Sequence, residues 1–145
     1  MSRLSLICRL VPALLAGCAP VAPQGPVLAL RLDRAVVERS DSGTAQVLLA
    51  LQNVGGAAAY FVGCAQPVGV WVERFISTGW TDAYGINTRC TTQIIPARLD
   101  LAPGQHVDVR FAFDQIGRYR LRLTFGASPQ QPYAYHQTTP EFEVR

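Results

Sequence analysis

The sequence contains no lysine and only two histidines, His106 and His136, in 145 residues. All 13 basic residues are arginines, and they form no run that would indicate a nucleic-acid footprint. The patterns of a serine nucleophile elbow, a zinc-protease helix, a phosphate loop and a calcium loop are also absent. We therefore expect a protein that is not an enzyme, takes no metal or cofactor, and binds no nucleic acid.

A sustained helical period is missing as well, whereas short alternating segments are frequent. Hydrophobic residues make up 49% of the chain, which excludes a disordered body. The clearest alternation runs from Val107 to Phe113 and from Tyr119 to Phe125. Further strands are predicted at about 27–33, 47–51, 57–62, 68–76, 90–95 and 142–144. Seven to nine short strands at this spacing predict an antiparallel β-sandwich.

The N-terminus has the parts of a secretory signal peptide. Arg3 and Arg9 precede a short apolar run that ends in small residues, Leu15-Ala16-Gly17-Cys18. A transmembrane anchor is a poor alternative, since seven apolar residues cover only about 10 Å of a bilayer core of about 30 Å. Ordinary cleavage without lipid is the stronger alternative.

The Leu-Ala-Gly-Cys ending resembles the lipobox of bacterial lipoproteins. This resemblance implies cleavage before Cys18, lipidation of Cys18, and a membrane as one partner. It divides the chain into a signal peptide (1–17), a lipidated Pro-rich tether (18–26) and one domain (27–145). In lipoproteins of two-membrane bacteria, Asp after the Cys favours the inner membrane; here that residue is Ala19. The resemblance thus implies an outer-membrane protein that faces the periplasm.

Two cysteines remain after such processing, Cys64 and Cys90. Disulfides persist in exported proteins, and two Cys without a nearby His make a poor zinc site. We therefore predict a Cys64–Cys90 disulfide, with free thiols as the alternative. Such a bond would pin the irregular, polar segment 77–89.

The last part of the chain resembles the closing half of bacterial immunoglobulin-like domains. The resemblance rests on a turn, Leu101-Ala102-Pro103-Gly104, then a strand, and then Gly117-x-Tyr119-x-Leu121. The segment 49–60, with Asn53 before the glycines, is similar to an early hairpin of these domains. The resemblance implies an immunoglobulin-like fold and leaves function open, because one fold serves many functions.

Two surfaces are candidates for binding a protein partner in the cell envelope. The first is a loop, 77–90, where aromatic residues and an arginine could anchor a partner: Trp80, Asp82, Tyr84 and Arg89. The second is a basic stripe on the outer face of the last strands: Arg110, Arg118, Arg120 and Arg122. The alternatives are that the aromatic residues cap the sandwich and that the stripe is a solvated sheet face.

The two clearest strands are expected to form a hairpin with Phe113 and Tyr119 both pointing inward. A three-residue loop, 114–116, would place Phe111 opposite Tyr119 and Asp108 opposite Arg122. A five-residue loop, 114–118, would instead place Phe113 opposite Tyr119. Opposite charges favour the shorter loop.

A different function follows from a second resemblance. The order Asn53, Trp71, Pro103-Gly104, Gly117-x-Tyr119 is similar to the intracellular proteinase inhibitor domain of Bacillus, also a β-sandwich. A non-catalytic binding or assembly module of the envelope remains the leading hypothesis, and a proteinase inhibitor is the alternative.

Overall fold

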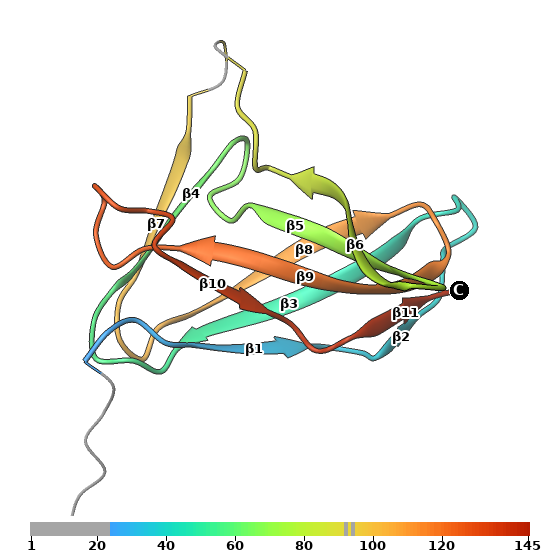
Figure 1. The fold of residues 1–145 in the computed structure, drawn as a ribbon, viewed down its shortest axis with the longest axis horizontal. Helices are drawn as coiled ribbons and strands as arrows, with labels where there is room; N and C mark the ends of the chain where they lie inside the picture. The colour runs from blue at the N-terminus through green and yellow to red at the C-terminus, as the bar shows by residue number, and fades with distance from the viewer. Residues whose placement is uncertain (1–23, 92, 94) are drawn as a thin grey trace, which may run out of the picture.

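The computed structural model describes residues 24–91, 93 and 95–145, and every regular element within them is a strand (Figure 1). The strands are β1 (Leu28–Leu32), β2 (Val36–Val37), β3 (Ala45–Asn53), β4 (Ala59–Gly63), β5 (Val70–Ile76), β6 (Gly79–Ile86), β7 (Ala97–Leu101), β8 (His106–Phe113), β9 (Gly117–Phe125), β10 (Tyr135–Thr138) and β11 (Phe142–Val144). The predicted all-β class is confirmed. No helix in these residues is long and apolar enough to cross a membrane.

Two sheets form the layers of an immunoglobulin-like sandwich. The three-stranded sheet has the order β1-β3-β8, and the six-stranded sheet has the order β2-β11-β9-β5-β6 with β10 also paired to β9. The strands β4 and β7 form a separate pair, which Tyr60 joins to Gly126 at the end of β9. All pairs are antiparallel except β2 with β11.

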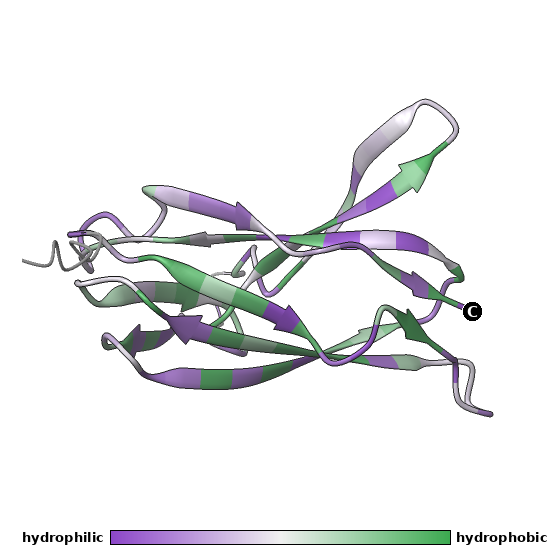
Figure 2. Cartoon of the chain, turned by 90° about the horizontal axis from the view of Figure 1, so that it is seen from below, coloured by the Kyte–Doolittle hydropathy of each residue, from purple (hydrophilic) through white to green (hydrophobic). Residues whose placement is uncertain are grey.

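The core lies between the two layers and follows the alternation in the sequence. Val47, Leu49 and Leu51 of β3 face inward, and Leu121 and Leu123 of β9 are buried from the other sheet. Figure 2 shows the two layers from the side, with hydrophobic and hydrophilic bands alternating along the strands. Burying one such side chain contributes about 1.5–3 kcal/mol, so these strands supply a large share of the stability.

The predicted hairpin between β8 and β9 is wrong, because these strands belong to opposite sheets. Among the described strands, β8 pairs with β3 alone, and β9 pairs with β5, β10 and β11. The link 114–116 crosses from one layer to the other, so neither predicted register exists. Phe113 and Tyr119 do point inward as predicted, and their rings contact across the layers with centroids 5.2 Å apart.

Two further predictions of local structure are wrong. Segment 77–89 is not irregular, because most of it forms β6, the strand after a tight turn from β5. The described residues between Cys90 and Pro96 form no strand, whereas the following residues form β7. The segment 49–60 is no hairpin either: β3 pairs with β1 and β8, and β4 pairs with β7.

Asn53 is the polar residue that fixes this divergence of β3 and β4. Its buried side-chain amide donates to the carbonyls of Ala57 and Leu101, each at 2.8 Å, and its Oδ1 accepts from the Gly55 N–H at 3.0 Å. The Asn53 N–H also donates to the Gln105 carbonyl at 3.0 Å. One side chain therefore holds the end of β3, the following turn and the end of β7 together.

Cys64 and Cys90 form the predicted disulfide, with Cα atoms 5.1 Å apart. Cys64 directly follows β4, and Cys90 lies four residues after the end of β6. The Cys64 N–H also donates to the Asn87 carbonyl at 2.9 Å. The bond thus ties the chain beyond β6 to the end of β4.

The predicted signal peptide (1–17), Cys18 and most of the predicted tether lie outside the described residues. From Gly25 onward the chain already packs on the domain. The Gly25 carbonyl accepts from the Gly56 N–H at 3.2 Å, and Pro26 is buried. The described chain starts at one end of the sandwich, and Arg145 lies at the opposite end (Figure 1).

Replacing Asn53 by Leu should lower the free energy of unfolding by about 2–3 kcal/mol, because two carbonyls and one N–H lose buried partners. Denaturant unfolding measures the change. The control is Gln52→Leu on the exposed face of the same strand, which should shift stability by less than about 0.5 kcal/mol. Equal effects of the two changes would contradict the role given to Asn53.

Peptide mapping of the unreduced protein, produced in an oxidising compartment, should find Cys64 and Cys90 linked. Reduction should destabilise the domain by about 3 kcal/mol, since the bond spans 26 positions and constrains the unfolded chain. Two free thiols in the native protein would contradict the disulfide. A Cys64→Ala/Cys90→Ala variant should reproduce the reduced stability and no longer respond to reductant.

Candidate functional site

A β-bulge in the hairpin of β5 and β6 decides which side chains reach each face of the six-stranded sheet. Val72 pairs with Tyr84 while the next residue, Glu73, pairs with Asp82, so Ala83 is left over. Val72 points into the core, and Tyr84 shares its face. Asp82 shares the outer face with Glu73. The bulge therefore sends Tyr84 inward and Asp82 outward.

The predicted binding loop is consequently divided between two faces. Trp80 and Asp82 lie on the outer face, where Trp80 pairs with Phe75. Arg89 places its guanidinium 5.6 Å from the centre of the Trp71 ring on that same face. Tyr84 lies on the other side of β6. The four residues do not form one patch.

The structure brings three residues of the predicted basic stripe together on β9 and places Arg110 on another sheet. Arg118, Arg120 and Arg122 alternate with inward residues along β9 and line its outer face. Arg110 lies on β8 in the three-stranded sheet. The error has the same cause as the predicted hairpin, since both assumed that β8 and β9 are neighbours.

Acidic side chains neutralise the three arginines of β9. Glu73 forms ion pairs with Arg120 and Arg122, the latter at 3.3 Å. Arg122 also donates to both carboxylate oxygens of Asp82 at 3.0 and 3.1 Å. Arg118 forms an ion pair with Glu141. We call these residues, with Phe75 and Trp80, the Arg–aromatic network.

Aromatic rings cover two of these arginines, Arg118 and Arg120. The Arg118 guanidinium lies 4.7 Å from the Phe75 ring centre, and that of Arg120 lies 4.5 Å from the Trp80 ring centre. Phe75 and Trp80 pack edge to face at 5.4 Å. Such contacts stabilise by about 0.5–1 kcal/mol each at exposed sites. The network satisfies its own charges and is no free basic surface.

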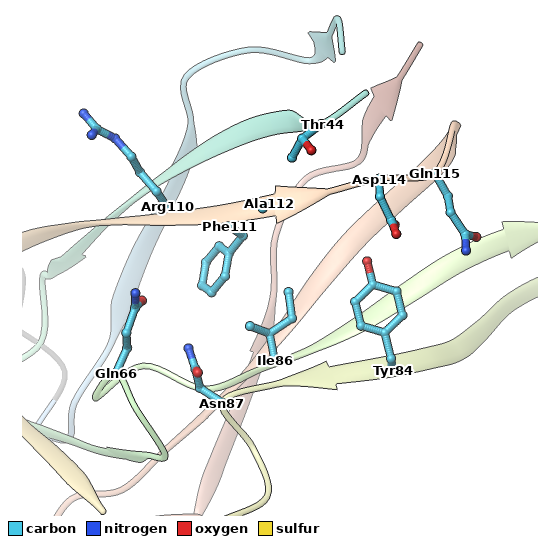
Figure 3. Close-up of a pocket in the computed structure, with 10 residues that line it drawn as sticks. All are labelled: Thr44, Gln66, Tyr84, Ile86, Asn87, Arg110, Phe111, Ala112, Asp114 and Gln115. Atoms are coloured by element: carbon cyan, nitrogen blue, oxygen red, sulfur yellow. The ribbon is translucent and has the colours of Figure 1, made fainter. Parts of the chain in front are cut away.

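A groove that the sequence did not reveal lies between β6 and β8, the edge strands of the two sheets (Figure 3). Its volume is about 710 Å³. We call it the edge groove. Its lining residues are Thr44, Gln66, Tyr84, Ile86, Asn87, Arg110, Phe111, Ala112, Asp114 and Gln115.

The edge groove exists because the six-stranded sheet extends past the three-stranded sheet. Tyr84 and Ile86 are cross-strand neighbours of the fully buried Val72 and Val70, so they point toward the other layer. Yet 40% of the Tyr84 surface stays exposed, since none of the described strands pairs with the outer edge of β8. Part of the inner face of β6 is therefore uncovered.

The end of the edge groove near the β8–β9 link is polar. The Tyr84 hydroxyl points toward the Asp114 carboxylate (Figure 3). Burial, together with the nearby Tyr119 and Asp114, raises the pKa of Tyr84 to about 12, and Arg74 opposes this shift. Tyr84 therefore keeps its proton at neutral pH and can donate a hydrogen bond to a ligand.

The two histidines lie far apart in the fold. His106 begins β8, an edge strand, and His136 lies on β10 in the other sheet; both are exposed. In the part of the chain that the structure describes, no three His, Cys, Asp or Glu side chains cluster as metal ligands would.

Sequence reasoning missed the edge groove because the bulge hides the signal. Tyr84 and Ile86 alternate as strand residues do, but Ala83 breaks the alternation with Trp80 and Asp82. A polar and aromatic segment of this kind resembles a loop. Recognising a strand with a one-residue insertion would have separated the two faces.

Comparison with known proteins identifies the fold and no family. The sequence matches no protein-family model, and no curated protein matches it. The putative ApaA protein of Bordetella pertussis has a similar structure, with 12% identity, a TM-score of 0.51, and coverage of 86% of this chain and 95% of that one. This likeness supports the immunoglobulin-like sandwich.

Weaker likenesses accompany it. A CARDB domain of Pyrococcus furiosus, crystallised in complex with di-metal ions, is 16% identical with a TM-score of 0.42, and the match covers 88% of this chain and 95% of that one. A β-glucosidase of Listeria innocua is 12% identical with a TM-score of 0.40, and 82% of this chain covers only 16% of that enzyme.

Replacing Glu73 by Gln should lower the free energy of unfolding by about 1–2 kcal/mol. Its side chain is 8% exposed, and its carboxylate neutralises Arg120 and Arg122, which would then repel each other. Urea unfolding in low and high salt measures this effect, and high salt should reduce it. The control is Asp82→Asn, whose side chain is 56% exposed and should matter less. An equal loss in both variants would contradict this account.

Proposed function

We propose that this protein is a lipid-anchored binding module of the bacterial envelope that acts without catalysis. The observation that carries the binding role is the uncovered inner face of β6 beside the free edge of β8. Sandwich domains bury the inner faces of both sheets as a rule. Inward-pointing side chains that stay partly exposed, as on β6, therefore indicate a surface that another molecule can cover.

The Arg–aromatic network is a weaker candidate for binding. Its arginines already have Glu73, Asp82 and Glu141 as partners, and a ligand would have to displace them. The edge groove carries Arg110 and Asp114 on its walls, and among the described residues neither forms an ion pair with another side chain. We therefore place the partner in the edge groove.

The anchor part of the proposal comes from the sequence. Leu15-Ala16-Gly17-Cys18 is similar to a lipobox, and Ala19 follows the cysteine. The chain packs on the domain from Gly25, which leaves only about six residues between the lipid and the sandwich. At about 3.3 Å per extended residue, the domain would lie within about 20 Å of the membrane. Because Ala19 and not Asp follows the cysteine, we place the anchor in the outer membrane, with the domain in the periplasm.

Replacing Cys18 by Ser should move the protein from the membrane fraction to the soluble fraction. A serine at this position cannot take the lipid, and one lost chain removes most of the membrane affinity. Fractionation with immunodetection is the measurement, and Cys64→Ser is the control that should stay in the membrane. If the Cys18→Ser protein remained in the membrane fraction, the lipid anchor would be refuted.

A further inference from the structure

We propose that the edge groove accepts an extended peptide as a fourth strand of the three-stranded sheet, paired along β8. The inference rests on the binding role proposed above and names its partner class: an exposed, extended segment of another protein with alternating side chains. Edge strands with free backbone groups are templates for such pairing.

The hydrogen-bond pattern between β3 and β8 shows which backbone N–H and C=O groups of β8 point away from β3. The Asn53 N–H donates to the Gln105 carbonyl, and the register of β3 with β8 continues from this pair. In antiparallel strands the bonding direction alternates from residue to residue. Val107, Val109 and Phe111 therefore bond to β3, whereas Asp108, Arg110 and Ala112 direct their N–H and C=O groups to the open edge.

The edge groove has room for one strand and not for a second sheet. Tyr84 and Ile86 of β6 project over the open position beside β8 (Figure 3). A second copy that paired its β8 here would bring its own β6 into the same space. A single peptide strand meets no such obstacle, and its inward side chains would cover Tyr84 and Ile86. An apolar residue at each inward position is the natural complement.

Charge on the outer face gives the peptide a direction. Asp108 and Arg110 are exposed there, and their neighbours on β3 are the uncharged Ala50 and Leu48. An antiparallel peptide would place an acidic residue opposite Arg110 and, two residues later, a basic residue opposite Asp108. The expected pattern is apolar–acidic–apolar–basic, over about five residues or roughly 17 Å.

Synthetic peptides test the inference directly. The first is a capped nine-residue peptide with Val at inward positions, Glu opposite Arg110 and Arg opposite Asp108. The second has Glu and Arg exchanged. Titration calorimetry with the full chain carrying Cys18→Ser should show about tenfold tighter binding of the first peptide. Because this protein needs no lipid, the result is independent of the anchor.

Variants of β8 provide the decisive comparison. The double change Asp108→Arg/Arg110→Asp should reverse the preference between the two peptides. Arg31→Glu, a charge change on the same outer face but on the opposite edge strand, should leave the preference unchanged. Ala112→Pro removes an N–H at the open edge without touching the β3 ladder, and it should weaken both peptides at least tenfold.

Several results would overturn the inference. One is binding of neither peptide to a protein whose circular dichroism and unfolding are normal. Another is a preference that the double change does not reverse. A third is seen by sedimentation of the protein alone. If the protein were a dimer that Ala112→Pro converted to a monomer, the open edge of β8 would bind a second copy of the chain and not a peptide. Loss of folding in Ala112→Pro would leave the charge reversal as the test.

Discussion

The unequal width of the two sheets is the constraint on which the surfaces of this protein depend. In the described residues, a path of five strands packs on a path of three, and β6 is the last strand of the longer path. The core can be closed under β9 and β3, but not under the last strand of the wider sheet. At this position β6 carries two large side chains, Tyr84 and Ile86, which line the edge groove. The edge groove is the geometric result.

The outer face of the same sheet has the opposite character. Glu73, Asp82 and Glu141 balance three arginines, and two aromatic rings cover the guanidinium groups of Arg118 and Arg120. This arrangement keeps long, charged side chains ordered on a surface that would otherwise be solvated. The charges of the outer face are thus satisfied internally, whereas Tyr84 on the inner side of β6 stays partly exposed.

Alternation in the sequence predicted the β-class and the inward residues of β8 and β9, and the two cysteines left after the expected processing predicted the disulfide. Alternation did not predict which strands are neighbours, because Phe113 and Tyr119 face the core whether their strands lie side by side or in opposite layers. Arg110 was assigned to the wrong sheet for this reason. The edge groove depends on Ala83 and on sheet width, and neither is readable from a local pattern.

The bulge at Ala83 has a consequence for how this surface can change. A strand normally couples its two faces, since any insertion or deletion exchanges them. Here the phase shift falls between Asp82 and Tyr84, so Trp80 and Asp82 lie on the charged outer face, whereas Tyr84 and Ile86 line the edge groove. Substitutions at Trp80 or Asp82 can therefore adjust the outer network, while substitutions at Tyr84 or Ile86 change the lining of the edge groove. One strand thus carries two surfaces that can vary independently.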